Sequence, residues 1–377
     1  MKINILKHSR YSILVGMLIG IVLLNFFLFK NEDENNFENF ALKQNDKTLM
    51  ASFENEKIHC SDLKDLELCL KGYKKNSKNP VILWLGNSQL HVINQYQAGD
   101  ETAAKLIHSL LREFGFYTLT FSQANANLQE HFLLFTHLIN YFPIETLILP
   151  VVFDDLREDT IRAEIKDILK DNVSYSKINN TLTGKNLINI FKNEYTIDEG
   201  TNSSEKESKD YFENLLDEKL SNYWSLWYQR DILRGQVLSK LYILRNSIFR
   251  IKATTTRKMI KDRYEKNINA FRDILKIAKI NEISVLVYIP PIRNDVKIPY
   301  QIEEYDEFKK KLKDISDENK VYFISLENLV PSEFWGLKNS TNLEKSEELD
   351  FMHFQSYGHS LLANEISKKI IKILQLY

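Results

Sequence analysis

Short apolar runs rich in branched and aromatic residues alternate along this chain with longer segments in which apolar residues recur every three or four positions. The apolar runs predict buried strands at Val81–Leu85, Tyr117–Phe121, Thr146–Phe153, Ser284–Ile289 and Val321–Ser325. The periodic segments predict amphipathic helices at Glu101–Phe114, Glu130–Tyr141, Ile268–Ala278, Glu303–Ile315 and Ser356–Leu374. Alternating strands and helices are typical of a parallel sheet with helices on both faces, so the sequence predicts a three-layer α/β fold.

One long segment interrupts this alternation. The pattern stops after about residue 160 and resumes near residue 267, which predicts a mainly helical insertion at about 163–264. Within it, Asp198–Asp210 is polar and lacks apolar periodicity, which is typical of disorder. An aromatic cluster that contains Trp224 and Trp227 follows. Such a cluster either packs the insertion on the core or stacks on sugar rings or lipid headgroups, so these tryptophans are candidate substrate-binding residues.

The N-terminus carries an apolar run without any charge, Ser12–Phe29. At helical rise its length approaches the thickness of the hydrocarbon layer of a bilayer, so residues 1–30 are predicted to form a transmembrane signal anchor. Lys2, Lys7 and Arg10 precede the run and acidic residues follow it. Because basic residues favour the cytoplasmic side, we expect a cytoplasmic N-terminus and a main domain in the periplasm or at the cell surface. A cleaved signal peptide is the alternative.

Composition and charge define the rest of the chain. The polar segment 31–57 lacks periodicity and is predicted to be a tether, which leaves the folded domain at 58–377. The 50 basic and 51 acidic residues nearly cancel, so no nucleic-acid partner is indicated. The two cysteines, Cys60 and Cys69, can form a disulfide outside the cytoplasm, unless the residues between them are one continuous helix. A metal site formed by these cysteines with His59 lacks a fourth ligand nearby.

Two short fragments carry chemistry. The first predicted strand is followed by Gly86, Asn87 and Ser88, which places a serine hydroxyl on the turn that leaves a buried strand. Asp350 and His353 are three residues apart, just before the last helix. Each fragment alone is a weak signal, but together they supply a nucleophile, a general base and a carboxylate that orients the base.

This order of motifs resembles the SGNH, or GDSL-like, hydrolase superfamily, in which the serine follows the first strand and the Asp and His share a block before the last helix. The resemblance covers roughly residues 80–160 and 265–377. It implies a flavodoxin-like parallel sheet. It also implies that Ser88 is the nucleophile, that His353 is the general base and that Asp350 orients the imidazole.

The sequence departs from the family pattern at the oxyanion hole. At the family's glycine after the second strand, the aligned blocks place Asn127, which tolerates left-handed backbone geometry. After the third strand, where the family shows Gly-x-Asn-Asp, Asp154 replaces the asparagine donor. An ionised carboxylate there would repel an oxyanion, so Asp154 is either protonated, bypassed by another donor, or a helix cap. The candidate oxyanion residues are Ser88, Asn127, Asp154 and Asn125, with Gln123 and Arg157 as further substitutes.

Membrane-tethered members of this superfamily modify envelope polymers, and this chain is similar to the D-alanine transfer protein and to alginate O-acetylation proteins. The resemblance implies a serine acyltransferase or esterase that acts on acyl groups, chiefly acetyl, of an envelope polysaccharide or glycolipid. A membrane-bound O-acyltransferase is then the expected partner. The alternative is a catalytically impaired protein that keeps the fold and binds polymer or partner. No cofactor is expected, because the sequence shows no phosphate-binding glycine loop or metal motif.

Overall fold

The computed structural model describes the chain as two compact units. The described residues are 15–17, 20, 42–43, 45–76, 79–199, 219–220, 230–344 and 346–374. The larger unit, here called the sheet unit, comprises residues 41–201, 251–340 and 344–377, and the smaller one comprises residues 1–40, 202–250 and 341–343. The main described element of the smaller unit is the helix α10 (Arg230–Ile248).

Two predictions concern residues outside this description. Of the anchor predicted at 1–30, only residues 15–17 and 20 are described, and Trp224 and Trp227 lie outside the described residues. Within the residues that the structure does describe, no helix is both long enough and apolar enough to span a bilayer. The transmembrane anchor and the tryptophan cluster therefore stay predictions.

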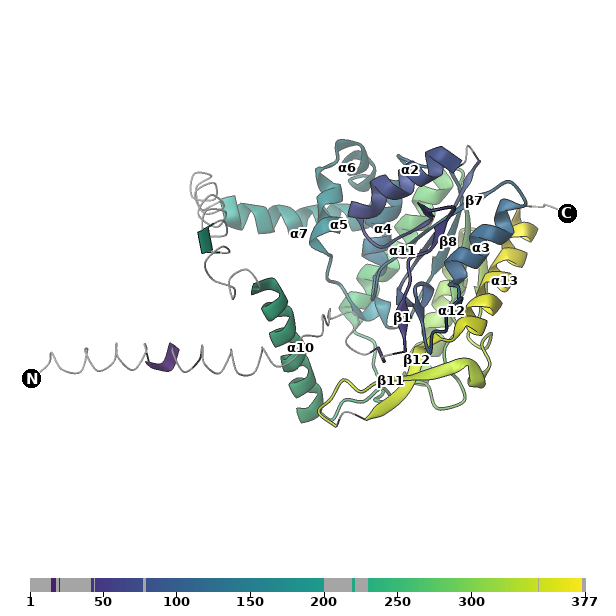
Figure 1. The fold of residues 1–377 in the computed structure, drawn as a ribbon. Helices are drawn as coiled ribbons and strands as arrows, with labels where there is room; N and C mark the ends of the chain where they lie inside the picture. The colour runs from purple at the N-terminus through teal and green to yellow at the C-terminus, as the bar shows by residue number, and fades with distance from the viewer. Residues whose placement is uncertain are drawn as a thin grey trace, which may run out of the picture. The chain divides into compact units, whose positions relative to one another are not determined.

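A six-stranded parallel sheet forms the centre of the sheet unit (Figure 1). Its strands are β4 (His59–Cys60), β5 (Val81–Gly86), β7 (Tyr117–Ser122), β8 (Ile144–Pro150), β9 (Ser284–Ile289) and β10 (Tyr322–Ser325). Their order in space is β10-β9-β8-β5-β7-β4, and neighbouring strands are parallel. The first predicted strand thus lies between the second and the third, which is the flavodoxin-like order. The predicted parallel α/β sheet is confirmed.

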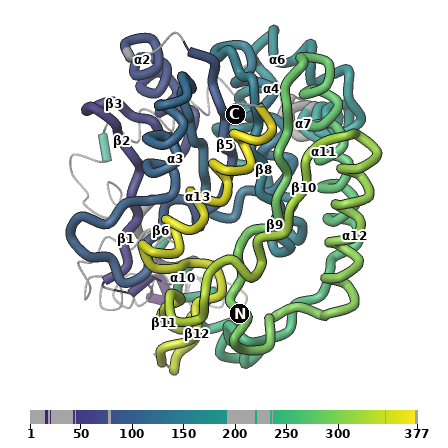
Figure 2. The backbone as a smooth tube through the Cα atoms, turned by 90° about the vertical axis from the view of Figure 1, so that its right-hand side faces the viewer, coloured from purple at the N-terminus to yellow at the C-terminus, as the bar shows by residue number. Residues whose placement is uncertain are grey.

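Side chains on the two faces of the sheet pack into two separate apolar layers. On β5, Leu83 packs into one layer and Trp84 into the other, as the alternation of side chains along a strand requires. One face is covered by α2 (Leu66–Asn76), α4 (Leu128–Leu138), α11 (Lys261–Ile280) and α12 (Ile302–Glu318). The other face is covered by α3 (Ala103–Arg112) and α13 (Ser356–Ile373), which pack side by side (Figure 2).

The described parts of the region 163–264 are mainly helical, apart from the irregular segment 249–260. Within the sheet unit this region contains α5 (Ala163–Lys166), α6 (Asn172–Ile178), α7 (Leu182–Glu199) and the first residues of α11. Its remaining described helix, α10, belongs to the smaller unit.

Three small strand pairs lie outside the predicted alternation. β1 (Lys47–Thr48) pairs with β6 (Val92–Ile93), and β2 (Ser52–Phe53) pairs with β3 (Glu56–Lys57). The sequence placed β1, β2 and β3 in a tether, but the structure makes them part of the sheet unit. The third pair is the antiparallel hairpin of β11 (Trp335–Asn339) and β12 (Glu347–Phe354).

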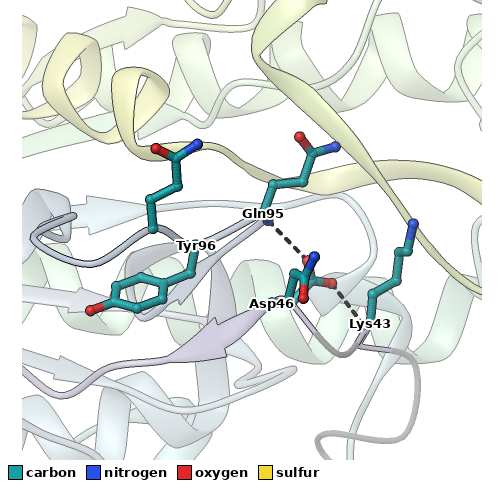
Figure 3. Close-up of a pocket in the computed structure, with 6 residues that line it drawn as sticks. Lys43, Asp46, Gln95 and Tyr96 are labelled. Atoms are coloured by element: carbon teal, nitrogen blue, oxygen red, sulfur yellow. Dashed lines mark hydrogen bonds between the residues drawn. The ribbon is translucent and has the colours of Figure 1, made fainter.

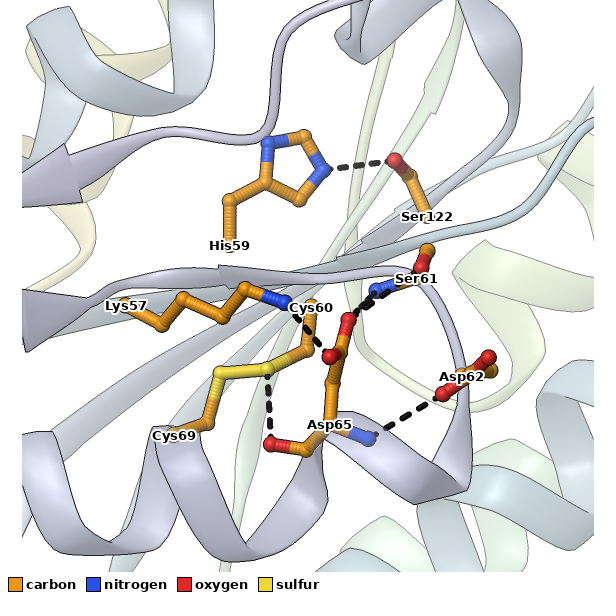
Figure 4. Close-up of a disulfide and its surroundings, with 8 residues drawn as sticks. All are labelled: Lys57, His59, Cys60, Ser61, Asp62, Asp65, Cys69 and Ser122. Carbon is orange, nitrogen blue, oxygen red and sulfur yellow. Dashed lines mark hydrogen bonds and ion pairs between the residues drawn. A yellow bond between two sulfur atoms is a disulfide. The ribbon is translucent and has the colours of Figure 1, made fainter.

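Cys60 and Cys69 form a disulfide, with their Cα atoms 6.6 Å apart (Figure 4). The residues between them form a loop and a short 3-10 helix, η2 (Leu63–Asp65), before α2 begins at Leu66. Because the interval is not one continuous helix, the two sulfur atoms can meet. The bridge fastens the edge strand β4 to α2.

Candidate active site

Ser88 stands at the carboxyl end of the central strand β5. It opens a 3-10 turn, η3 (Ser88–Leu90), which Asn87 caps by accepting a hydrogen bond of 3.1 Å from the N–H of Gln89. Gly86 permits this tight turn, because a Cβ at that position would overlap the side chain of Leu90. The sequence thereby presents a serine at the edge of the sheet where open α/β folds bind their ligands.

His353 and Asp350 reach Ser88 from strand β12. The Nε2 atom of His353 lies 2.9 Å from Ser88 Oγ, and its Nδ1 atom lies 2.9 Å from Asp350 Oδ2. Because the Asp350 carboxylate accepts the Nδ1 hydrogen, Nε2 is left to receive the proton of the serine hydroxyl. The fold thus brings three predicted residues into one hydrogen-bonded chain, although Ser88 and His353 are 265 positions apart in the sequence.

The Asp350 carboxylate is fixed and ionised. Its residue is 1% exposed, and Oδ1 accepts hydrogen bonds from the N–H groups of Met352 and His353 at 2.9 and 3.0 Å. Burial alone would raise the pKa of Asp350, but the charge and hydrogen bond of His353 and the Met352 N–H hold this pKa below its ordinary value. An ionised Asp350 orients the imidazole and stabilises the imidazolium that forms when Ser88 gives up its proton.

Gln89 ties the nucleophile turn to the strand that carries the base. Its buried side chain donates from Nε2 to the carbonyls of Met352 and Pro291, each at 2.9 Å. Met352 immediately precedes His353, so Gln89 fixes the backbone of the base relative to Ser88. The sequence analysis did not identify this residue, because an amide beside a serine does not indicate which distant carbonyls it will bind.

A second buried polar cluster stabilises the turn that holds Ser88. Ser122 Oγ, at the end of β7, lies 2.6 Å from His91 Nδ1. The same atom lies 2.6 Å from His59 Nε2 (Figure 4). Burial lowers the pKa of His91 to about 3, with the nearby charge of His353 acting in the same direction, and burial lowers the pKa of His59 well below its usual value. Both imidazoles are therefore neutral, and each ring nitrogen lies within hydrogen-bond distance of the Ser122 hydroxyl, which can both donate and accept. The His91 N–H donates to the Ser88 carbonyl at 3.1 Å, which links the cluster to the nucleophile.

Asp155 holds the turn through Asn87. The Asn87 amide donates from Nδ2 to Asp155 Oδ2 at 3.1 Å, and both residues are buried. Burial raises the pKa of Asp155 well above its usual range; the bond from Asn87 opposes this shift, and the charges of neighbouring carboxylates, Asp154 first among them, add to it. Asp155 therefore favours its neutral form.

The side chain of Asp154 is engaged by two arginines. Arg157 Nη1 lies 3.2 Å from Asp154 Oδ1, and Oδ2 accepts hydrogen bonds from Arg257 and from the Tyr300 hydroxyl, the latter at 3.1 Å. Two guanidinium groups therefore balance the charge that was expected to repel an oxyanion. The helix-cap alternative is wrong for Asp154, because within the described chain its side chain makes no cap bond to the 3-10 turn η4 (Asp155–Arg157).

Asn127 does not have the left-handed geometry expected for it. Its φ is −89°, and its side chain caps α4 by accepting two backbone N–H groups of the first turn. The left-handed residue is Asn125, with φ 54°. Asn125 is exposed and lies in a turn closed by a 3.2 Å hydrogen bond from the Ala126 N–H to the Gln123 carbonyl. Asparagine tolerates this conformation, so the turn after β7 is set at Asn125.

This turn lies on the same edge of the sheet as Ser88. Gly86 pairs with Ser122 in the parallel register of β5 and β7, so the residues that follow both strands are neighbours. The Ser88 N–H opens η3 and has no partner within that turn. Among the described residues, no hydrogen bond uses the N–H of Ala124 or Asn125. These backbone N–H groups therefore have no described partner at the edge of the sheet that holds Ser88.

The two further substitutes, Gln123 and Arg157, already make hydrogen bonds to other groups. The Gln123 N–H donates to the Gly86 carbonyl at 3.1 Å, and its side-chain oxygen accepts from Arg162 at 3.4 Å. Arg157 donates from Nε to the Lys258 carbonyl at 2.8 Å in addition to its contact with Asp154.

Comparison with known proteins finds similar folds at low identity. No protein-family model and no curated protein matches the chain. A Bacteroides fragilis chain assigned as an acylhydrolase is 11% identical, with a TM-score of 0.40 over 83% of this chain and 99% of that chain. A Parabacteroides merdae chain assigned as a GDSL-like lipase is 14% identical, with a TM-score of 0.35 over 76% of this chain and 94% of that chain. An acetylxylan esterase from Geobacillus stearothermophilus is 10% identical, with a TM-score of 0.36 over 79% of this chain and 96% of that chain. With similarities this weak, function rests on the geometry of Ser88, His353 and Asp350.

Proposed function

We propose that this protein is an SGNH-type serine esterase or acyltransferase that removes or transfers acyl groups, chiefly acetyl, on a polysaccharide or glycolipid of the cell envelope. One observation supports the proposal above all others: His353 lies 2.9 Å from Ser88 on one side and 2.9 Å from Asp350 on the other. A hydroxyl, an imidazole and a buried carboxylate in this order are the equipment for nucleophilic attack on an ester carbonyl.

The reaction proceeds through an acyl-serine. Ser88 Oγ attacks the carbonyl carbon of the ester while His353 Nε2 takes the serine proton, and the imidazolium then gives that proton to the departing alcohol. Water or a sugar hydroxyl next attacks the acyl-serine, His353 accepts its proton, and the proton returns to Ser88. Hydrolysis and transfer therefore share the first half and differ only in the acceptor.

The N–H groups of Ser88, Ala124 and Asn125 are the proposed oxyanion donors. Each lies at the carboxyl edge of β5 or β7, and none is used by another hydrogen bond of the described residues. Backbone donors that are fixed before the reaction stabilise the developing charge without a cost of reorganisation.

The proposed setting is the outer side of a membrane. The apolar run Ser12–Phe29 would anchor the chain, and the disulfide between Cys60 and Cys69 is typical of an oxidising compartment. A membrane-bound O-acyltransferase is the proposed partner, since it would supply acyl groups from the other side of the bilayer.

The second candidate is a catalytically impaired protein that binds an envelope polymer. The observation that favours it is Asp154, which stands where an amide donor was expected. The pairing of Asp154 with Arg257 and Tyr300 weakens this alternative, because the carboxylate charge is balanced within the protein.

The test is ester turnover by the full-length chain in detergent. We expect 4-nitrophenyl acetate to be hydrolysed at least a hundredfold faster by the wild type than by Ser88→Ala, because the alanine removes the nucleophile. Equal rates would contradict the proposal and favour the binding protein. If the enzyme is a transferase, an added unacetylated oligosaccharide accepts the acetyl group from the acyl-serine in place of water. Mass spectrometry then detects the acetylated oligosaccharide.

A further inference from the structure

A polar hollow of about 300 Å³ opens where the N-terminal segment meets the strand that follows the nucleophile turn (Figure 3). Its lining residues are Lys43, Asn45, Asp46, Gln95, Tyr96 and Gln97. The first three belong to the segment predicted to be a tether, and the sequence pattern indicates no role for the others.

Two observations place this hollow beside the triad. The Asn94 N–H donates to the Phe354 carbonyl at 3.0 Å, so the residue before Gln95 is bonded to the residue after His353. In addition, burial raises the pKa of the Asp46 carboxyl, the bonds from the Lys43 and Gln95 N–H groups oppose this shift, and the charges of Asp350 and His353 make smaller contributions of opposite sign.

The hollow is held in shape by hydrogen bonds between segments that are far apart in the sequence. Asp46 accepts from the N–H of Lys43 at 2.8 Å and from the N–H of Gln95 at 3.0 Å, and it lies between them in Figure 3. The Tyr96 N–H donates to the Asn45 carbonyl at 2.8 Å. A site that is ordered before its ligand arrives loses less entropy on binding.

The hairpin that carries Asp350 and His353 supports the same segment. Asn339 donates from its amide to the Leu42 carbonyl at 2.7 Å, and Lys43 Nζ lies 2.6 Å from Glu347. Both partners belong to the β11–β12 hairpin, which also holds Asp350 and His353. The hollow and the catalytic base therefore share one supporting element.

The lining suits a neutral ligand rich in hydroxyl groups. Among the described residues, no hydrogen bond uses the side-chain amides of Asn45, Gln95 or Gln97, so each offers both a donor and an acceptor. The Tyr96 ring adds a flat apolar surface, with the Lys47 ammonium 4.6 Å from its centroid. The charge of Lys43 is balanced by Glu347, so no unpaired charge on that lysine calls for an ionic ligand.

We infer that this hollow is a carbohydrate subsite, which holds one sugar ring of the polymer while the acyl group on that polymer, or the accepting hydroxyl, reaches Ser88. The volume lies at the lower limit of ligand pockets, which fits a single ring. The inference deepens the proposed function and rests on it for the identity of the reaction.

The test is isothermal titration calorimetry on the full-length chain in detergent, with Ser88→Ala as the background so that no ester is turned over. The probes are xylotetraose and tetra-N-acetylchitotetraose. We expect at least one of them to bind, and we expect Tyr96→Ala to weaken that binding at least tenfold, because it removes the ring on which the sugar lies. Tyr96→Phe keeps the ring and should retain most of the affinity.

Two further variants distinguish loss of the subsite from loss of the fold. Gln97→Ala removes an exposed side chain without any described hydrogen bond, so it should weaken binding without unfolding the protein. The matched control is Tyr322→Ala, a tyrosine that is 52% exposed on the distant edge strand β10, and it should bind as the background does. The inference is overturned if neither sugar binds, or if Tyr96→Ala and Gln97→Ala both bind as tightly as the background.

Failure of the subsite and failure of the proposed function give different results. A protein that binds sugar through Tyr96 but hydrolyses no ester would contradict the acyl chemistry and leave the subsite standing. A protein that hydrolyses 4-nitrophenyl acetate through Ser88 but binds neither oligosaccharide would overturn the subsite alone.

Discussion

Three carboxylates of the site, Asp350, Asp155 and Asp154, have different partners. Asp350 is buried but ionised, because His353 and backbone N–H groups favour its charged form. Asp155 is buried among other carboxylates and favours its neutral form. Asp154 is balanced by Arg157 and Arg257. Burial alone therefore does not decide the charge of a carboxyl group, since the groups around it can outweigh desolvation.

The first prediction concerns Asp154→Asn, which restores the amide expected from the family pattern. Because the side chain is held by Arg257 and Tyr300, we expect no gain in kcat for 4-nitrophenyl acetate and a loss of stability on the order of 1 kcal/mol from the broken ion pairs. Steady-state kinetics and urea unfolding measure the two effects. An increase in kcat of tenfold or more would show that Asp154 faces the oxyanion after all.

The second prediction concerns the pH dependence of stability at Asp155. The folded state holds the Asp155 proton above the ordinary carboxyl pKa, whereas the unfolded chain releases it above about pH 4. The contribution of Asp155 to the free energy of unfolding of the wild type therefore decreases as the pH rises. Asp155→Asn cannot titrate and can still accept from Asn87, so its stability relative to the wild type should increase between pH 4.5 and pH 7.5. Urea midpoints at both pH values test this, and a difference that does not change with pH would contradict it.

The β11–β12 hairpin is the element on which the site depends most. It carries Asp350 and His353, and it is fixed to the nucleophile turn by Gln89 and to the following strand by Asn94, whose amide donates to the Leu337 carbonyl at 3.2 Å. Glycine at position 336 makes room for this contact, because a Cβ there would overlap the Asn94 amide.

The third prediction is that Gly336→Ala displaces the hairpin. Overpacking of this kind costs about 1–3 kcal/mol, and the shift of His353 should also lower kcat for 4-nitrophenyl acetate at least tenfold. The control is Gly235→Ala in α10, where a Cβ would have no described atom within 4 Å and alanine should be neutral or favourable. An active and fully stable Gly336→Ala protein would show that the hairpin tolerates movement.

The fourth prediction concerns the disulfide between β4 and α2. The bridge closes a loop with a sequence separation of 9, for which the loss of chain entropy in the unfolded state corresponds to about 2–3 kcal/mol. We expect a reductant to lower the urea midpoint of the wild type and to leave that of the Cys60→Ser, Cys69→Ser double variant unchanged. The same midpoint for the wild type with and without reductant would mean that the bridge adds no stability.

Across the whole chain, the features that depend on local pattern were predictable. Apolar runs and helical periodicity predicted five of the six strands of the sheet and five of the helices that cover it, because the inner strands are buried on both faces. The edge strand β4 and the helix α2 were not predicted. The conjunction of Ser88 with Asp350 and His353 indicated the three residues that the fold joins. These signals are local in the sequence, and the parallel order of the sheet then decides where they meet.

The remaining features depend on contacts between distant segments. Asp46 belongs to a stretch that looks like a polar tether, but it accepts a hydrogen bond from the Gln95 N–H, and its neighbour Lys43 pairs with Glu347 of the hairpin. Gln89 and Ser122 act through partners that no spacing rule indicates. The left-handed turn fell on Asn125 instead of Asn127, because Asn127 is used to cap α4. One sequence does not reveal which of two asparagines will take each task.

The most direct measurement of the central claim is covalent labelling of the full-length chain with a fluorophosphonate, read by intact mass and peptide mapping. We expect a single adduct on Ser88, abolished by Ser88→Ala and strongly slowed by His353→Ala, because the imidazole 2.9 Å from the hydroxyl makes that serine nucleophilic. A folded protein that takes up no label, or that is labelled at Ser88 equally well without His353, would contradict the assignment of Ser88 as nucleophile and His353 as base.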